Sequence, residues 1–423
     1  MDNRLHILWV KMGGLWPITS GGRLRSFHII DELSRHHNVT VLTTSDSESE
    51  NTALSSHLPD CQRVKSFLFK PPKKDSRKFI GSLAASWLTP LPVDLYKYQC
   101  PALRREVESE LNSGRFDLCI ADFLTSVPNI PLQGRTPKIL FSHNVEYMIW
   151  RRLYDNEKNW LKRFLLAIEW RKMRRSETQA CNAAAATIAV SKEDARLLLQ
   201  GSPEARITSV VTGVDINFFK PDAAKGKHPT SLVFSGSMDW HPNEDAILHF
   251  MDRILPIIRL EIPDARLSIV GRNPSERLQA AAKIADVEVT GTVADIRPWL
   301  HRAAVYIVPL RVGGGTRLKI YEALAMGKAV VSTTIGAEGL NLRNDVHLLR
   351  ADGEKEFARQ TVRLLRNPEL AQDLGMAGRQ LMEANYAWSQ VARQFENLCR
   401  EALPSAQNST HQQFESNHGK DQL

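Results

Sequence analysis

The chain has 423 residues, of which 43% are hydrophobic and 24% charged, which is the composition of a globular protein too long for one ordinary core. We therefore expect two domains. Lysine and arginine number 55 against 47 acidic residues, a net charge of +8, which favours an anionic partner such as a phosphate-bearing substrate or an anionic membrane surface without selecting one.

The five cysteines are scattered and none forms a CxxC pair, which argues against a zinc site or a disulfide framework and favours a reducing compartment. The first apolar run, residues 5–10, is short for a signal peptide and has Asp2 and Lys11 beside it. No stretch approaches the ~20 apolar residues of a membrane-spanning helix. We expect a cytoplasmic protein.

The first half of the chain alternates β-branched runs with amphipathic helical patterns, which is typical of a parallel sheet flanked by helices. The first strand is followed by a glycine-rich loop and a helix over about residues 23–35. Residues 46–115 are predicted to be irregular, and a long helix is predicted over about residues 145–181. The predicted strands are residues 6–10, 39–43, 118–121, 139–142, 187–190 and 207–211.

The second half repeats this alternation more cleanly, and its strands end in glycine or small residues. The pattern predicts an α/β fold with two doubly wound, Rossmann-like domains that face a cleft, where a substrate would bind. A final helix could cross back to the first domain. The predicted divisions are residues 1–218 for the first domain, 219–230 for a linker, 231–388 for the second domain, 389–403 for the final helix and 404–423 for a disordered tail.

The most informative segment begins at Val308 and reads VPLRVGGGTRLKIYEALAMGKAVV. A strand runs through three glycines directly into a helix, whose first N–H groups have no partners within the helix, so the loop can hold a phosphate. Arg317 can add a bidentate contact and Lys319 a point charge. Glu322 can accept hydrogen bonds from a ribose diol. The alternative is a glycine-rich connection followed by an ordinary surface helix.

This segment resembles the donor-binding signature of GT4-type retaining glycosyltransferases with the GT-B fold, in a branch with a GGGTRLK loop. That family typically carries two glutamates eight residues apart. Glu322 matches the second glutamate, whereas Gly314 stands where the first is expected, which affects the usual contact with the transferred sugar. The resemblance implies that the donor is bound by this loop and the helix after it. The residues concerned are Gly314, Gly315, Thr316, Arg317, Leu318, Lys319 and Glu322.

The resemblance extends to the opening of the second domain, where Ser237 and Pro242 occupy positions at which many members carry arginine and lysine. Arg317 and Lys319 would then supply that charge. Thr292 and Val293 match the loop that faces the nucleobase.

In the first domain, Gly22 begins a helix that could face the donor phosphates, although a plain helix start explains it equally well. His143 follows a strand and resembles the family's histidine beside the reacting sugar. The resemblance implies catalytic roles for His143, Arg317 and Glu322.

By resemblance, the reaction transfers a sugar from a nucleotide-sugar donor to a glycan, lipid-linked or small-molecule acceptor with retention of the anomeric configuration. A helix N-terminus with two cations can neutralise the leaving phosphate without a metal, and the sequence has no DxD-like motif in a plausible site. We therefore expect no metal and no cofactor, and no nucleic-acid partner. Two alternatives stay open: a non-catalytic sugar-nucleotide binding protein, and a sugar-nucleotide 2-epimerase of the same architecture.

Residues 151–175 carry nine basic side chains and three acidic ones, with tryptophan and phenylalanine between them. Cations beside aromatic side chains suit a surface that meets anionic lipid headgroups, which predicts peripheral contact with the inner face of a membrane. The alternative is that the aromatic residues are core and the cations form a solvated helix face.

Overall fold

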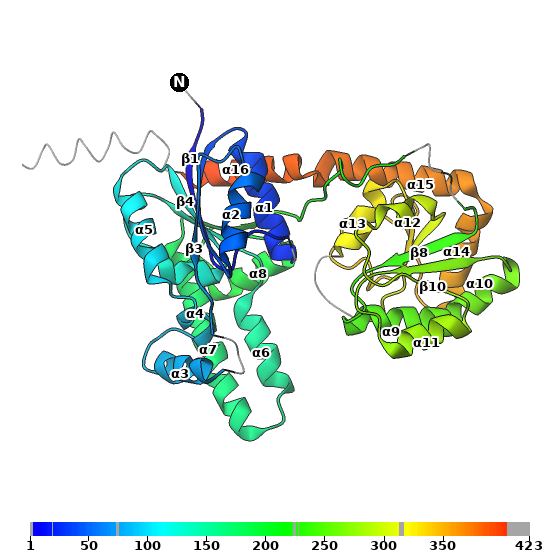
Figure 1. Ribbon diagram of the computed structural model, residues 1–423, viewed down its shortest axis with the longest axis horizontal. Coiled ribbons are helices and arrows are strands. Elements are labelled where there is room, and N and C mark those ends of the chain that lie inside the picture. The colour runs from blue at the N-terminus through cyan, green and yellow to red at the C-terminus, as the bar shows by residue number, and fades with distance from the viewer. Residues whose placement is uncertain are drawn as a thin grey trace, which may run out of the picture. The chain divides into compact units, whose positions relative to one another are not determined.

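The computed structural model describes residues 3–18, 20–72, 76–222, 226, 228–312 and 317–403 (Figure 1). The chain divides into two compact units. Unit 1 contains the chain up to Val211 together with the chain from Val391 onward, and unit 2 contains Thr212–Gln390. Each unit is an α/β structure built on one parallel sheet, so the predicted fold class is confirmed.

Unit 1 has a seven-stranded sheet in the order β3-β2-β1-β4-β5-β6-β7, with every pair of neighbours parallel. The order reverses between β1 and β4, and open α/β sheets bind ligands outside the carboxyl ends of their strands at such a reversal. The strands are β1 (His6–Lys11), β2 (Asn38–Ser45), β3 (Arg63–Leu68), β4 (Leu118–Asp122), β5 (Lys138–Ser142), β6 (Ala186–Ala189) and β7 (Ile207–Ser209).

Helices cover this sheet and bury its β-branched and leucine side chains; the core strands β1, β4 and β5 are almost completely buried. The helices are α1 (Gly21–Ser34), α2 (Glu48–His57), α3 (Arg77–Trp87), α4 (Val93–Tyr96), α5 (Pro101–Asn112), α6 (Glu146–Asn156), α7 (Trp160–Ala183) and α8 (Lys192–Gly201). The last helix, α16 (Trp388–Glu401), begins in unit 2 and contributes Phe395 to the core of unit 1, where its ring packs on Trp9 and Phe141.

Unit 2 repeats the same topology with six strands in the order β10-β9-β8-β11-β12-β13, so its reversal lies between β8 and β11. The strands are β8 (Ser231–Ser235), β9 (Arg266–Val270), β10 (Glu288–Val289), β11 (Val305–Val308), β12 (Ala329–Ser332) and β13 (Leu349–Arg350). The helices are α9 (His241–His249), α10 (Leu255–Glu261), α11 (Glu276–Ile284), α12 (Arg297–Arg302), α13 (Leu318–Ala325), α14 (Glu354–Arg366) and α15 (Pro368–Leu381).

Two predicted segments differ from the structure. Residues 46–115, predicted to be irregular, contain β3 and four helices, α2 to α5. The predicted single helix over residues 145–181 is two helices, α6 and α7, because Asn159 caps a new helix by accepting hydrogen bonds from the N–H groups of Leu161 and Lys162. Of the predicted linker, residues 223–225 and 227 lie outside the described residues, as does the tail from residue 404.

Candidate functional site

Beside the reversal point of unit 2, the loops that follow β8 and β9 touch through their backbones. Gly236 follows β8 and Gly271 follows β9, and a Cβ atom added to Gly271 would lie 1.7 Å from the carbonyl oxygen of Gly236. The N–H of Gly236 donates to the carbonyl of Val270 over 3.0 Å, and the N–H of Met238 donates to the carbonyl of Arg272 over 2.9 Å. Only glycine fits this approach, so the two loops form one fixed wall at the carboxyl end of the sheet.

Ser237, predicted from the resemblance, lies on this wall. Its hydroxyl accepts a hydrogen bond from Arg272 Nε over 2.7 Å and donates to Asp239, whose other oxygen accepts from Asn273 over 2.9 Å. Arg272 therefore brings a guanidinium beside Ser237, where the sequence comparison found the family's usual cation missing. Arg272 was not predicted from the sequence, although its place directly after Gly271, the residue that follows β9, was a signal for it.

Lys319 reaches the same wall from the first turn of α13. Its ammonium donates to Oδ1 of Asn243 over 2.8 Å and lies 4.2 Å from the ring centre of Phe234, the penultimate residue of β8. Asn243 is buried in the first turn of α9, and its side-chain amide also donates a hydrogen bond to the carbonyl of Ser237 over 2.8 Å. The structure thus brings two predicted residues, Ser237 and Lys319, together through a third that was not predicted.

Glu322 lies one turn after Lys319 on α13, and the two charges act on each other. Burial lowers the pKa of Lys319 to about 7, against the opposing effect of Glu322. Burial raises the pKa of Glu322 to about 7, against the opposing effect of Lys319. Near neutral pH the pair can therefore take up or release a proton when a charged ligand arrives.

Arg317 stands directly before α13 and is 4% exposed, with its guanidinium 5.8 Å from the ring centre of Trp240. Burial lowers its pKa, although Glu338 opposes this effect. Among the described residues no side chain caps the helix that follows, so its first N–H groups and its positive dipole end can face an anion. Gly314, Gly315 and Thr316 lie outside the described residues.

The other predicted residues of unit 2 lie around this centre. Leu318 and Val293 are half-buried and pack against the same apolar cluster, which includes Tyr306 of β11. Thr292 is exposed, in the loop that follows β10.

In unit 1, His143 follows β5 and is 3% exposed. Its imidazole stacks on Phe123 with ring centres 3.8 Å apart and an angle of 2° between the planes. Its Nε2 lies 2.7 Å from Oδ1 of Asp122, the last residue of β4. The predicted Gly22 lies against the same phenylalanine, because a Cβ atom there would come within 2.4 Å of the Phe123 ring. The structure therefore brings Gly22 and His143 together, with Phe123 between them.

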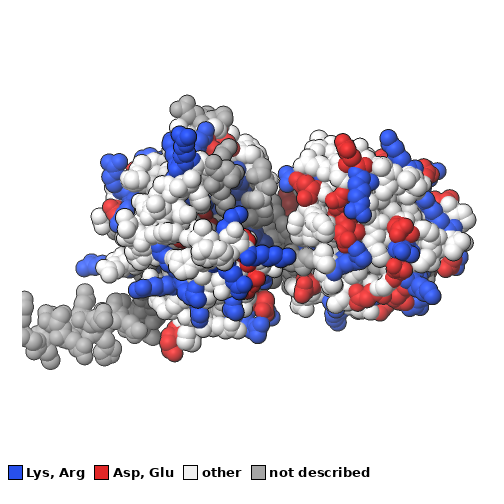
Figure 2. Space-filling view, turned by 90° about the horizontal axis from the view of Figure 1, so that it is seen from below, with Lys and Arg blue, Asp and Glu red and all other residues white. Residues whose placement is uncertain are grey.

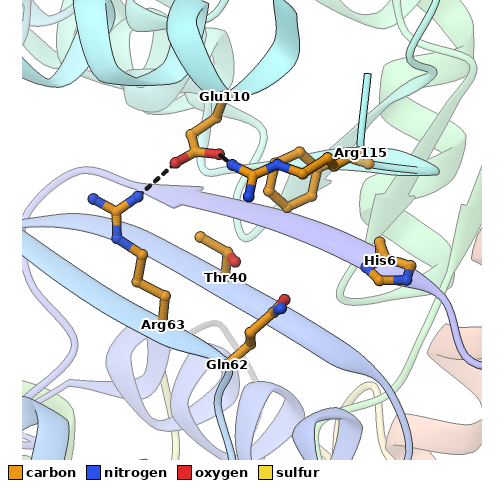
Figure 3. Close-up of a pocket in the computed structure, with 7 residues that line it drawn as sticks. His6, Thr40, Gln62, Arg63, Glu110 and Arg115 are labelled. Carbon is orange, nitrogen blue, oxygen red and sulfur yellow. Dashed lines mark hydrogen bonds and ion pairs between the residues drawn. The ribbon is translucent and has the colours of Figure 1, made fainter. Parts of the chain in front are cut away.

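One cavity of unit 1, of about 430 Å³, lies elsewhere (Figure 3). It is lined by His6 and Arg63, the first residues of β1 and β3, and is therefore at the amino ends of the strands, away from His143. Glu110 stands between two guanidinium groups there and accepts from Arg63 and from Arg115, at 2.5 and 2.8 Å (Figure 3). Since these charges satisfy one another, we assign this cavity no role.

The chain matches two family models. Residues 20–218 match "Glycosyltransferase Family 4", and residues 229–367 match "Glycosyl transferases group 1". The protein carries two glycosyltransferase domains. The first covers the part of unit 1 that contains Gly22 and His143, and the second contains the wall of Gly236 and Gly271 with Lys319 and Glu322.

Two relatives are similar to this chain in sequence. An uncharacterized 44.6 kDa protein in the cps region of Klebsiella pneumoniae is 21% identical over 387 residues, which is 88% of this chain and 94% of that protein. The GDP-mannose-dependent alpha-(1-6)-phosphatidylinositol monomannoside mannosyltransferase of Mycobacterium tuberculosis is 29% identical over 223 residues, which is 47% of this chain and 57% of the relative.

Solved structures with the GT-B fold are similar to this chain. HepE of Anabaena, solved in complex with UDP, has a TM-score of 0.64 at 14% identity and covers 94% of this chain and 100% of its own. The sucrose-phosphate synthase of Thermosynechococcus elongatus has a TM-score of 0.65 at 16% identity and covers 94% and 99%. At these identities the likeness establishes the fold alone.

Proposed function

We propose that the protein transfers a sugar from a nucleoside diphosphate sugar to a glycan or lipid-linked acceptor, with retention of the anomeric configuration. The observation that carries the proposal is the pairing of Lys319 and Glu322 on the first turns of α13, beside the reversal point of the unit 2 sheet. This arrangement offers a cation and an uncapped helix end to a diphosphate, and a carboxylate to a ribose.

The leaving diphosphate gains negative charge as the bond to the sugar breaks. Arg317, Lys319 and the N–H groups at the start of α13 are fixed donors for that charge, and fixed donors need no reorganisation during the reaction. In this proposal they replace a metal ion. Arg272, held by Ser237, adds a further cation to the same wall.

The structures of Anabaena HepE with UDP and with UDP-glucose support a nucleoside diphosphate sugar as the donor class. The phosphatidylinositol monomannoside in the name of the Mycobacterium tuberculosis relative supports a lipid-linked glycan as the acceptor. His143, which resembles the family's histidine beside the reacting sugar, would contact the transferred sugar.

The experiment is a panel of UDP-, GDP- and ADP-sugars incubated with the purified protein, with and without lipid-linked glycan acceptors, followed by release of nucleoside diphosphate. Acceptor-dependent release, with an anomeric proton coupling in the product that matches the donor's configuration, is the expected result. Release of nucleoside diphosphate without acceptor, together with an epimerised sugar, would identify a 2-epimerase. Donor binding without any turnover would identify a sugar-nucleotide binding protein.

The α6–α7 hairpin supports a membrane-borne acceptor. Of the aromatic residues predicted there, Trp150 is buried and Trp170 is half-buried, as the core interpretation requires. Trp160 and Phe164, at the start of α7, are instead 79% and 59% exposed. Figure 2 shows lysine and arginine side chains at many places on this side of unit 1, with fewer aspartate and glutamate side chains among them.

Three acids lie within residues 151–175, but Glu169 does not reach the surface. It is 2% exposed and accepts from Trp87 Nε1 and from the N–H of Val93. The nine basic side chains of this stretch are exposed or half-buried, and only two acidic side chains, Asp155 and Glu157, are exposed or half-buried with them. Exposed aromatic side chains beside cations are suited to the headgroup region of an anionic bilayer, each cation contributing about 1 kcal/mol. We propose that this hairpin holds the protein peripherally at the inner face of a membrane.

No helix within the described ranges combines the length and the hydropathy needed to cross a membrane. The membrane proposal is tested by co-sedimentation with vesicles of rising anionic-lipid content. Changing Trp160 and Phe164 to serine should reduce binding, whereas Leu260→Ser should not, although Leu260, in unit 2, is 84% exposed. Binding that is independent of lipid charge, or equal in all variants, contradicts the proposal.

A further inference from the structure

Lys11 is a buried cation at the reversal point of the unit 1 sheet. It is the last residue of β1, is 2% exposed, and pairs in register with Asp122, the last residue of β4. A buried ammonium without an anion is too costly to persist, and its Nζ lies 3.5 Å from Oδ2 of Asp122. The ion pair therefore stands at the carboxyl ends of the two strands where such a sheet binds its ligand.

The carboxylate of Asp122 contacts nitrogen atoms of three side chains: Trp9, Lys11 and His143. Its Oδ2 accepts from Trp9 Nε1 over 2.9 Å and faces the Lys11 ammonium, while its Oδ1 lies 2.7 Å from His143 Nε2. An ionised carboxylate can only accept, so Nε2 of His143 carries the proton and Nδ1 is left with its lone pair. Nδ1 is buried and has no hydrogen-bond partner among the residues that the structure describes.

The orientation of the imidazole is fixed as well. Its ring lies parallel to that of Phe123, and the Lys11 ammonium lies 4.0 Å from the centre of the same phenylalanine ring. Phe123 has a φ of 71°, in the left-handed region that a phenylalanine seldom adopts. Strain of this kind persists only where the surroundings impose it, and here they place the ring between the histidine and the Gly22 backbone.

The charges around His143 explain its protonation state. Among the described residues, Lys11 of β1, Asp122 of β4 and Arg25 of α1 are charged groups that shift its pKa, and the rings of Phe123 and Phe141 pack against the imidazole. Burial lowers the pKa of His143 to about 4; Asp122 opposes this, and Lys11 and Arg25 add to it. Beside the ion pair of Lys11 and Asp122, a neutral imidazole adds no further buried charge.

We propose that Lys11 is a positioning residue for His143: by neutralising Asp122 it keeps the imidazole uncharged, with its proton on Nε2, and reserves Nδ1 as a hydrogen-bond acceptor for the transferred sugar. The part of this inference that concerns the sugar rests on the proposed function. The part that concerns the imidazole does not.

The test follows the titration of His143 by NMR in protein labelled with ¹⁵N-histidine, with His143→Gln to assign its signal among the 13 histidines. In the unchanged protein the imidazole should be neutral at pH 6 and carry its proton on Nε2. In Lys11→Met the Asp122 charge is left alone with the imidazole, so the pKa of His143 should rise by roughly 1–3 pH units. Lys11→Arg keeps the charge and should keep the low pKa.

The double variant Lys11→Met/Asp122→Asn covers the case in which Lys11→Met fails to fold, because it removes both buried charges together and should leave the imidazole neutral. An imidazole charged at pH 6 in the unchanged protein overturns the inference. So does a low pKa in folded Lys11→Met, or a raised pKa in Lys11→Arg or in the double variant.

Turnover separates this inference from the proposed function. In Lys11→Met, kcat should fall as the pH drops through the raised pKa of His143 and recover above it, while the KM for the donor changes little. A shifted histidine titration with an unchanged pH profile of kcat leaves the role of Lys11 intact and removes His143 from the reaction.

Discussion

Donor binding should exchange protons with solvent, and the sign should reverse near pH 7. The free protein holds Lys319 and Glu322 with pKa values of about 7. A bound diphosphate favours the charged ammonium, and a bound ribose diol favours the charged carboxylate. At pH 8, Lys319 is about nine-tenths neutral, so binding should take up about 0.9 proton. At pH 6, Glu322 is about nine-tenths protonated, so binding should release about 0.9 proton.

The assay is calorimetry of the intact nucleotide sugar in buffers of different ionisation enthalpy, because its diphosphate bridge does not itself titrate in this range. Between pH 7 and 9 the affinity should fall by up to tenfold per pH unit, or about 1.36 kcal/mol. Lys319→Met should abolish the proton uptake at pH 8. At pH 6 it should weaken binding by about 1.5–3 kcal/mol, the range for hydrogen bonds to charged groups.

Glu322→Gln is the matched control. It should abolish the proton release on donor binding at pH 6 and leave the proton uptake at pH 8. The reasoning would be refuted if donor binding exchanged almost no protons with the buffer at either pH. It would also be refuted if Lys319→Met still took up protons on donor binding at pH 8. Either result would mean that the two side chains do not meet the donor.

Three further predictions concern single residues. Glu322→Ala should weaken binding of the nucleoside and of the nucleotide alike by about 1.5–3 kcal/mol in calorimetry, and unchanged affinity would place it outside the site. Gly271→Ala should lower the free energy of unfolding by more than the ~1–3 kcal/mol of ordinary overpacking, because its Cβ would overlap the Gly236 carbonyl. Gly81→Ala, where a Cβ meets open space within α3, is its control and should stabilise the protein in denaturant titrations. His143→Ala should reduce kcat strongly with little change in donor affinity, and equal losses of both would contradict its placement beside the sugar.

The strand-and-helix alternation of the sequence predicted the fold class correctly because both sheets are parallel and buried, so their strands read as plain apolar runs. The same rule fails at β3, whose sequence RVKSFL is partly exposed at the edge of its sheet and carries no continuous apolar run. Helices α4 and α5 were missed because prolines, which often mark loops, stand at their starts: Pro92 and Pro101.

The candidate site was predictable where its residues are adjacent in the chain and hidden where they are not. Lys319 and Glu322 share one helix, so the sequence could assign both to one donor-binding segment. Lys11 and Asp122 are separated by more than a hundred residues and meet only through the register of β1 and β4. The sequence alone does not indicate that a lysine at the end of a strand is buried. Asn243 was hidden in the same way, because its partner Lys319 comes from a distant helix.

Helix α16 returns from unit 2 to unit 1, and this affects the order in which the two units can fold during synthesis. Phe395 is fully buried between Trp9 and Phe141, and Arg400 and Glu401 bond to Asn3 and Arg206. On the ribosome, the strands of unit 1 are therefore made first but cannot close their core until residues beyond Phe395 have emerged. All of unit 2 can fold in the meantime, so the domain that begins the chain is the last to be completed.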